Sequence, residues 1–457
     1  MFRVKPANFY ISYNYMNTIP QLKIGFLGLQ TPFEFAKNPL NLVERGFAQL
    51  GDTFLVNLIS YPVLVSRDPA VFKHVLQQNN KNYIKARAVK VLKMSLGNGL
   101  LTSEGEFWLR QRRLAQPAFH RERLQELFKT MGEITANFLQ ELEQSRNQKS
   151  VDVDALMMGL TADIALKTLF STITNEDKGR IYQQMNRSQE YIIQRVRQPY
   201  TIPLMAINGA NRRFKADMKF FDGMVYDIIS KRRKSNETQN DLLQLFLDSI
   251  DEETGESMND LQVRDEAVTM FAAGHETSAN GLNWLLLELS KRPEIVAKIR
   301  LECSIFEDVP TFENLVQMPY TRQVVEESLR LFPPAWAVGR EPLDDDEVNG
   351  IEIKKGMSVF LPTYNLHRNP NIWKKPNEFN PENFNAENVK NRSKFDYLPF
   401  GAGPRYCIGQ QFALMEMQLI LAALIKRFSF EIDPTHPAEM FPMIVLKPKN
   451  GIKMFVK

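Results

Sequence analysis

The chain has 457 residues, of which 44% are apolar and 24% are charged, so it is long enough to bury a large hydrophobic core. Its formal net charge of +4 is small for this length and argues against a dedicated nucleic-acid-binding protein. Two cysteines, Cys303 and Cys407, exclude a disulfide framework and a four-cysteine zinc site, and they indicate a reducing compartment, which we expect to be the cytoplasm. No stretch reaches the ~18 uninterrupted apolar residues of a spanning helix, and residues 1–30 lack the apolar core of a signal peptide.

The pattern along the chain predicts a mostly α protein with small β-sheets. Residues 1–37 read as an N-terminal tail, and residues 38–103 as a strand-bearing region. In that region we expect a helix over 38–50, two strands over 53–66 that turn at Tyr61-Pro62, and a helix that opens at Asp68-Pro69. Residues 104–343 form a helical body, with breaks near 117, 148–151, 199–203, 234–241 and 252–257.

Residues 344–457 mix strands and turns with one long helix. The helix is expected over 409–427, where an apolar run contains no proline. Asn450-Gly451 predicts a hairpin within the final strands, over 444–456.

Cys407 precedes this helix in a glycine-containing stretch, Phe400 to Gly409. The positive end of a helix dipole and N–H groups presented by turn glycines both lower the pKa of a thiol, which suits a metal ligand. For Cys407 alone, a buried structural cysteine is an equally good interpretation. Cys303 has no such surroundings, and we expect it to be a packing residue.

Five positions of this stretch have a fixed spacing: Phe400, Gly403, Arg405, Cys407 and Gly409. The pattern Phe-x-x-Gly-x-Arg-x-Cys-x-Gly resembles the haem-binding loop of the cytochrome P450 family. The resemblance implies a single P450 domain over residues 1–457, with haem b between a long central helix and the Cys407 loop. It implies that Cys407 is the axial ligand of the iron and that Arg405 pairs with a haem propionate. It also implies that Phe400 shields the sulfur from water and that Phe400 and Gly401 belong to the cofactor-binding site.

Trp108 and Arg112 lie four residues apart on one face of a helix expected to begin near Glu104. In isolation, a core tryptophan beside a solvated arginine is the better interpretation. The pair also resembles the family's Trp-x-x-x-Arg, which implies that both residues bind the haem propionates, together with Arg340. Four arginines nearby form either a docking patch for an acidic electron donor or an ordinary solvated face: Arg110, Arg113, Arg121 and Arg123.

The longest helical pattern, over 260–290, contains Ala273-Gly274-His275-Glu276-Thr277 near its middle. Small residues let a flat group approach a helix, and Thr277 can bond back to the carbonyl of Ala273. A packing glycine and a surface glutamate would be favoured in an anonymous helix. The stretch resembles the family's Ala-Gly-x-(Glu or Asp)-Thr motif, which implies that Ala273 lies on the haem, Thr277 holds a proton-donating water and Glu276 passes protons inward. We expect His275 to pack away from the haem.

Glu327 and Arg330 lie three residues apart, a spacing that by itself signals only a weak surface ion pair. It resembles the family's Glu-x-x-Arg, which implies a buried structural pair behind the haem loop. The usual third partner is an arginine. Here Asn383 occupies that place, and it can donate a hydrogen bond but supplies no charge.

The resemblance implies a haem-thiolate monooxygenase that uses O2 to hydroxylate or epoxidise an apolar small molecule. Residues 96–103 look most like members that hydroxylate fatty acids. Because no nucleotide-binding glycine motif follows a strand, electrons must come from a separate ferredoxin or flavodoxin system with its reductase. We expect a monomer, and five residues to line the substrate pocket: Leu96, Ala273, Ala335, Ala337 and Val338. The segment 191–207 adjoins them, where Arg195 and Arg197 either meet a substrate carboxylate or are solvated.

Two alternatives share the cofactor. The first is a peroxide-driven enzyme of the same fold, which has less need of the Glu276–Thr277 pair. The second is a haem-based sensor, which does not need a proton-delivery pair. A sensor would also carry an output domain.

Overall fold

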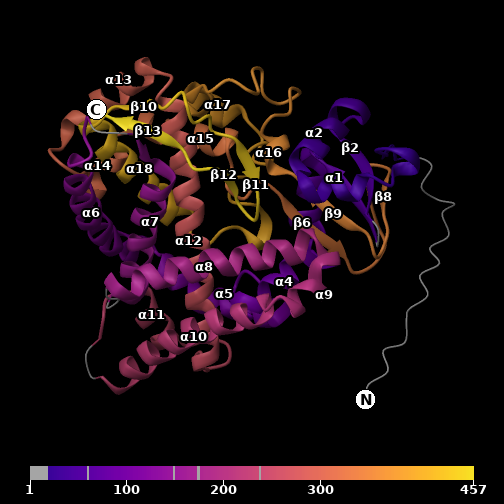
Figure 1. The fold of residues 1–457 in the computed structure, drawn as a ribbon, viewed down its shortest axis with the longest axis horizontal. Coiled ribbons are helices and arrows are strands. Elements are labelled where there is room, and N and C mark those ends of the chain that lie inside the picture. The colour runs from indigo at the N-terminus through magenta and orange to yellow at the C-terminus, as the bar shows by residue number, and fades with distance from the viewer. Residues whose placement is uncertain (1–18, 59–60, 148–149, 172–174, 236–237) are drawn as a thin grey trace.

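The computed structural model describes residues 19–58, 61–147, 150–171, 175–235 and 238–457 of the chain. Helices dominate these segments, and the small sheets predicted from the sequence are present (Figure 1). The largest sheet lies at one end of the molecule beside α1 and α2, whereas α6 and α7 lie toward the opposite end and α10 runs along the lower edge of the view.

The helices up to the long central one are α1 (Thr31–Lys37), α2 (Pro39–Leu50), α3 (Pro69–Lys73), α4 (Arg87–Leu96), α5 (Gly105–Ala115), α6 (Arg121–Glu143), α7 (Val153–Phe170), α8 (Asn175–Arg197), α9 (Ile202–Ile207), α10 (Ala210–Lys234), α11 (Leu242–Asp248) and α12 (Asp260–Leu289). After it come α13 (Pro293–Glu302), α14 (Phe312–Val316), α15 (Pro319–Leu331), α16 (Thr363–Leu366), α17 (Ala386–Asn391) and α18 (Gln410–Arg427). The helix breaks predicted near 117, 199–203, 234–241 and 252–257 are present in the described residues. In the break predicted at 148–151, residues 148–149 lie outside the described residues, and Val151 begins β5 (Val151–Asp152).

A six-stranded sheet has the order β1-β2-β3-β9-β6-β4. Its strands are β1 (Gln21–Leu22), β2 (Thr53–Leu58), β3 (Tyr61–Ser66), β4 (Tyr83–Lys85), β6 (Val338–Pro342) and β9 (Ser358–Leu361). The smaller sheets contain β5 (Val151–Asp152), β7 (Asp346–Val348), β8 (Ile351–Ile353), β10 (Phe430–Ile432), β11 (Met440–Pro442), β12 (Leu446–Pro448) and β13 (Lys453–Val456).

Local capping explains where several helices begin. The Asn38 side chain accepts from the N–H of Asn41 at the start of α2, and Asp68 accepts from Ala70 at the start of α3. Pro39 and Pro69 occupy the first helical position, where a missing N–H costs nothing. At the start of α12, Asn259 and Gln262 form a reciprocal capping box.

α12 passes through the main hydrophobic cluster and is buried along most of its length, packing closely on α7. It is a continuous α-helix across Gly274, so the sequence prediction of one long helix is confirmed. Because α12 is buried and packed, its polar side chains are held in fixed positions, as a binding or catalytic site requires.

The N-terminal region differs from the prediction. Residues 1–18 of the expected tail lie outside the described residues, but residues 19–37 include β1, which pairs in parallel with β2, and α1. Tyr61 and Pro62, expected at a turn, belong to β3, and residues 59–60 between the strands lie outside the described residues.

The predicted C-terminal hairpin is wrong. β12 pairs with β11, whereas β13 pairs with β10 and β5, so the strands on either side of Asn450-Gly451 do not pair with each other. Gly451 has φ 74° and lets the chain pass from one sheet to the other. Of the expected pocket residues Ala335, Ala337 and Val338, only Val338 belongs to a strand, as the first residue of β6.

Within the described segments, no helix has both the length and the apolar character needed to cross a membrane.

Candidate haem site

The stretch Phe400 to Gly409 forms a loop that ends where α18 begins. The N–H of Cys407 donates to the carbonyl of Phe400 (3.0 Å), which closes the loop on itself. Gly401 and Gly403 have φ of 73° and 67°, so the loop depends on their left-handed conformations. Phe400 is half-buried against the main hydrophobic cluster.

The Cys407 thiol is free and solvent-accessible. Burial raises its pKa, and the N–H of Gly409 and the charge of Arg112 oppose that effect. The expectation of a lowered pKa is therefore wrong, because desolvation outweighs the N–H groups. The raised pKa does not argue against ligation, since a coordinated metal ion deprotonates a thiol outright.

Cys303, by contrast, is fully buried in the main cluster, and its thiol contacts the carbonyl of Ala422 (3.6 Å). The prediction that it is a packing residue is confirmed.

Trp108, Arg112 and Arg405 meet beside the loop. The guanidinium of Arg405 lies 3.8 Å from the centre of the Trp108 ring, and it pairs with Glu104 and with the carbonyl of Ser103 (2.9 Å). Arg112 donates to the carbonyl of Tyr406 (3.0 Å), next to Cys407. Burial lowers the pKa of both arginines, to about 10 for Arg405.

Arg340 and Lys85 are direct partners across the β4–β6 pair. Their side chains therefore lie on the same face of the sheet, where like charges destabilise each other. Arg340 donates to the carbonyl of Gly339 (2.9 Å), and Lys85 to the carbonyls of Leu100 (3.3 Å) and Leu101. Burial lowers the pKa of Arg340 to about 10 and that of Lys85 to about 7.

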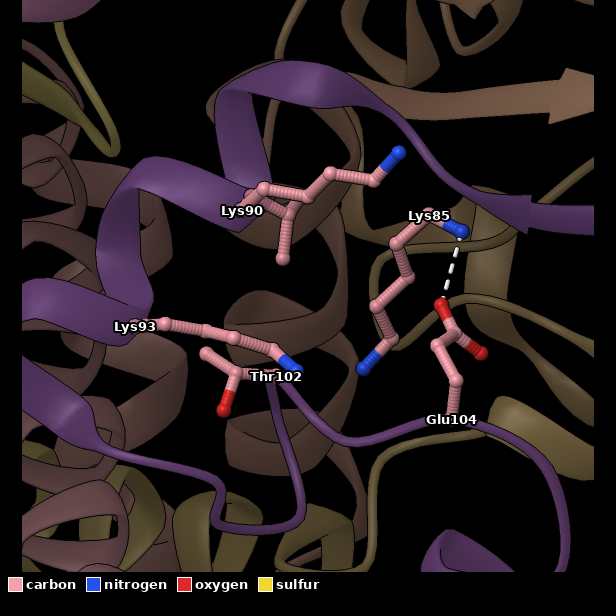
Figure 2. A pocket seen from close by; sticks show the side chains of 6 residues that line it. Lys85, Lys90, Lys93, Thr102 and Glu104 are labelled. Carbon is pink, nitrogen blue, oxygen red and sulfur yellow. Dashed lines mark hydrogen bonds between the residues drawn. The ribbon is translucent and has the colours of Figure 1, made fainter. Parts of the chain in front are cut away.

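Lys85 also lines a small pocket of about 240 Å³ with Lys90, Lys93, Thr102 and Glu104 (Figure 2). Its backbone N–H donates to Glu104 (2.8 Å), the carboxylate that also pairs with Arg405. Lys85 and Glu104 were not among the predicted site residues. The signal that pointed to them is weak: in β4, the alternate positions 83 and 85 are both buried, and one of them is a lysine.

This group of side chains suits a dianionic ligand. Four buried or half-buried cations come together: Lys85, Arg112, Arg340 and Arg405. Among the described residues, Glu104 pairs with Arg405 and Glu266 interacts with the charge of Lys85, so the four cations outnumber the carboxylates beside them. Because buried cations without counter-ions are costly, two carboxylates beside the Cys407 loop, such as the propionates of a haem, fit the residues present.

On α12, Thr277 donates to the carbonyl of Ala273 (2.8 Å), as predicted. Ala273 is exposed although Phe271 and His275 on either side are buried, so one face of small side chains is accessible in an otherwise buried helix. His275 stacks on Phe271 at 4.7 Å, and its ring N–H donates to the carbonyl of the same residue (2.8 Å), which confirms the packing prediction.

Glu276 is buried and accepts a hydrogen bond from the amide of Gln189 in α8 (2.7 Å). Burial raises its pKa, and Lys447 and Gln189 oppose that effect. Sequence reasoning missed Gln189, because no spacing along the chain connects residues 189 and 276.

Glu327 and Arg330 form a fully buried pair at 2.7 Å, as predicted. Arg330 also donates to the carbonyls of His367, Pro376 and Glu378. Asn383 donates to both carboxylate oxygens of Glu327 (3.2 and 3.3 Å), so it supplies a hydrogen bond in place of an arginine's charge.

The predicted pocket residues differ in accessibility. Ala335 is exposed, Ala337 and Val338 are half-buried, and Leu96 is only 8% exposed, at the end of α4 rather than in a loop. The segment at 335–337 lies under the β11–β12 hairpin, since the Trp336 indole donates to Met443 (3.0 Å) and the N–H of Leu446 to Pro334 (3.0 Å).

Three of the four arginines of the suggested docking patch pair with acids. Arg113 pairs with Asp251 and Glu253 at 3.0 Å, and Arg110 pairs with Glu256 at 3.2 Å. Arg123 pairs with Glu126 at 2.9 Å. These contacts favour the ordinary solvated face over a strongly basic patch.

Comparison with known proteins agrees with this site. Residues 20–455 match the family model for Cytochrome P450. The chain is 30% identical over 435 residues to Protein LUTEIN DEFICIENT 5, chloroplastic, of Arabidopsis thaliana, covering 90% of this chain and 72% of that protein. It is 32% identical to a Cytokinin hydroxylase of the same plant (90% and 82% covered) and 31% identical to Cytochrome P450 4A10 of Rattus norvegicus (86% and 81% covered).

The chain therefore belongs to the cytochrome P450 family. It is an oxidoreductase of the monooxygenase class, and its family uses a haem-thiolate iron, O2, a redox partner and apolar substrates.

Proposed function

We propose that this protein is a monooxygenase that hydroxylates or epoxidises an apolar acid, with a fatty acid as the first candidate, at a haem b held by Cys407. The cluster of Lys85, Arg112, Arg340 and Arg405 beside the Cys407 loop supports this most, because it suits two propionates. When bound, the haem supplies the iron that activates O2. Trp108, Arg405, Arg112 and Arg340 hold the propionate side, and Phe400, Gly401 and Ala273 pack on the macrocycle.

Thr277 and Glu276 act as the proton-handling pair. The hydroxyl of Thr277 is held by the carbonyl of Ala273 at 2.8 Å, so its oxygen has a fixed position on the accessible face of α12. Burial raises the pKa of the Glu276 carboxyl, which brings it closer to the range of a general acid near neutral pH.

Arg197 supports an acid as the substrate. It is the last residue of α8, half-buried, and its guanidinium lies 5.7 Å from the ring of Phe441 in β11. Burial lowers its pKa to about 10, and no hydrogen bond or ion pair joins its guanidinium to another described residue. The β11–β12 hairpin also covers the predicted pocket segment at Ala335 and Ala337. An apolar chain with one carboxylate is the ligand that such a cation favours.

Arg195 provides a matched control. Two residues from Arg197, it lies on a different face of α8 and donates to the hydroxyl of Tyr191 (3.2 Å). If Arg197 recognises a carboxylate, Arg197→Met raises the dissociation constant of a fatty acid about tenfold or more, because a charge-assisted hydrogen bond is worth about 1.5–3 kcal/mol. Arg195→Met then has little effect.

The test is an optical titration of the purified ferric protein with fatty acids, terpenes and steroids, following the haem spin state. The proposal is supported if fatty acids shift the spin state and Arg197→Met weakens that shift. A shift only with neutral terpenes or steroids refutes the proposal that the substrate is an acid. A reduced CO complex without a thiolate-type spectrum refutes the haem assignment itself. Turnover with peroxide but not with a reductase system would favour the peroxide-driven alternative.

The donor in this proposal is a ferredoxin or flavodoxin with its reductase, and the protein acts as a monomeric, single-domain enzyme in the cytoplasm. Reconstitution with each donor, with product measured per electron consumed, distinguishes the donor classes.

A further inference from the structure

A polar stripe runs along the face of α12 that packs on α7. Glu276, Asn280 and Asn283 are spaced i, i+4 and i+7, so they lie on one side of the helix. All three are buried, with exposed fractions of 6%, 1% and 0%. Polar side chains at such positions cost free energy unless they have a task or a partner.

Their hydrogen bonds are incomplete. The amide of Asn280 donates to the carbonyl of Glu276 (2.8 Å), and the amide of Asn283 donates to the carboxylate of Asp154 in α7 (2.6 Å). The Oδ1 atoms of Asn280 and Asn283 are buried and have no hydrogen-bond partner among the described residues. A buried acceptor without a protein partner is a position at which an internal water can bind, and these two acceptors lie along the helix between Glu276 and the contact with Asp154.

Asp154 lies at the outer end of the stripe. It belongs to the first turn of α7 and is half-buried, and its N–H donates to Asp152, the N-cap residue (3.2 Å). Asp152 points to the surface, where it pairs with Lys453 at 3.1 Å. Burial, and then the charge of Asp152, raise the pKa of Asp154 to about 6, while Lys447 and Asn283 oppose that shift.

The groups that face Glu276 come from three elements: Gln189 from α8, Lys447 from β12 and Asp154 from α7. Gln189 has no acidic proton to supply. Lys447 favours the ionised form of both Glu276 and Asp154, so its charge compensates whichever carboxyl is ionised. Of the two acids, Asp154 is the one nearer the surface.

We propose that Asp154, Asn283 and Asn280 form the proton route that recharges Glu276. In the transfer, the O–H bond of the Asp154 carboxyl breaks and an O–H bond forms on the Glu276 carboxylate, with waters held by Asn280 and Asn283 in between. Solvent then returns a proton to Asp154. The route rests on the proposed function, in which Glu276 serves Thr277, and it makes Asp154 a relay residue that touches neither substrate nor cofactor.

The test compares Asp154→Asn with Asp152→Asn in the holoenzyme. Asparagine keeps the size of Asp154 and can still accept from Asn283, and at position 152 it remains a good N-cap. The first readout is the infrared band of protonated carboxyls in the resting enzyme. We expect a band with a midpoint near pH 6 that Asp154→Asn removes. Asp152→Asn keeps this band but lowers its midpoint, because the charge of Asp152 raises the pKa of Asp154. The carboxyl band of Glu276 should move to a lower midpoint in Asp154→Asn, because the charge of Asp154 raises the pKa of Glu276.

The second readout is hydrogen peroxide released per product formed with O2 and a reductase. General acid–base groups contribute about 10²–10⁴-fold, and solvent can bypass an outer relay, so we expect Asp154→Asn to raise the ratio about tenfold. Asp154→Glu should restore most of the coupling, and Asn283→Ala added to Asp154→Asn should make it no worse, since both interrupt one route. Asp152→Asn should leave the ratio unchanged.

Equal peroxide ratios in Asp154→Asn and Asp152→Asn would overturn the route, as would a carboxyl band that Asp154→Asn leaves intact. Failure of the proposed function looks different: the unmodified enzyme then gives no thiolate-type CO spectrum or no product with any donor. In that case the shift of the Glu276 midpoint on Asp154→Asn still decides whether the two carboxyls are coupled.

Discussion

Gly403 and Leu76 approach each other so closely that a Cβ atom at position 403 would lie 1.8 Å from the carbonyl oxygen of Leu76. Leu76 belongs to a π-helical turn, His74–Gln78, and Gly403 begins the 3₁₀ turn Gly403–Arg405 that leads to Cys407. Position 403 also has φ 67°. The ligand loop therefore needs glycine there for two independent reasons, its conformation and its contact with a distant backbone.

The effect of Gly403→Ala separates these two reasons when it is compared with Gly401→Ala. Gly401 has φ 73°, but no atom lies within 4 Å of its Cβ position. Gly401→Ala should lower the free energy of unfolding by about 1–2 kcal/mol, the cost of a left-handed alanine. Gly403→Ala should cost clearly more and reduce the haem content of the purified protein, because backbone must move at Leu76. Denaturant unfolding and the haem-to-protein ratio measure both effects, and equal losses would refute the importance of the Leu76 contact.

The buried pair of Glu327 and Arg330 gives the second prediction. Glu327→Ala leaves a buried guanidinium without its carboxylate and should cost about 3–5 kcal/mol of unfolding free energy. Asn383→Ala removes one hydrogen-bond donor to the Glu327 carboxylate, which keeps Arg330 and the N–H of Asn380 as donors. We therefore expect the free energy of unfolding to fall by only about 1–2 kcal/mol.

Glu378→Ala is the control for that series. Glu378 pairs with Lys375 at the same i,i+3 spacing, 2.9 Å, but at the surface. Its loss should change stability by less than about 0.5 kcal/mol. A cost for Glu327→Ala no larger than this would mean that burial adds nothing to the pair.

Short motifs predicted the parts of the site that are local in sequence. The Cys407 loop, the Thr277 bond to Ala273 and the Glu327–Arg330 pair each depend on spacings of ten residues or fewer, and turn and helix geometry translate such spacings directly into contacts. The fold class followed from periodicity and from the same motifs.

Contacts between distant segments were not predictable in this way. Lys85 faces Arg340 because β4 pairs with β6, and no local pattern states which strands become neighbours. The hairpin expected at Asn450-Gly451 failed for the same reason: the turn residues fit, but β13 finds its partners in β10 and β5. The pKa of Cys407 was misjudged because the degree of burial is a tertiary property.

Glu416 in α18 gives a prediction on pH and stability. It is 1% exposed, and burial raises the pKa of its carboxyl to about 8. Because the folded protein holds this proton more tightly than the unfolded chain, the native state gains stability below the unfolded value near 4.5 and loses it as pH rises toward 8. Glu416→Gln removes that loss, so the melting temperature of the variant relative to the parent should rise between pH 5 and pH 8. The gain in unfolding free energy of the variant over the parent has an upper bound of about 4 kcal/mol at pH 8. A difference in melting temperature that stays constant between pH 5 and pH 8 would refute the prediction.

The facing pair of Lys85 and Arg340 predicts how haem affinity depends on pH. Burial lowers the pKa of Lys85 to about 7 in the haem-free site, and an anionic propionate binds the protonated amine more tightly. Haem affinity should therefore fall as pH rises through 7, and Lys85→Met should lower affinity at pH 6 and flatten this dependence. Arg340→Met should lower affinity at every pH, because burial brings the pKa of Arg340 only to about 10.

Lys93→Met is the control, since Lys93 lines the same pocket (Figure 2) but is exposed and bonded to Asn98 (2.9 Å). The rate of haem transfer to an excess of a scavenging protein between pH 6 and pH 9 measures all three. If haem affinity depends on pH as steeply in Lys85→Met as in the parent, a group other than Lys85 causes the pH dependence.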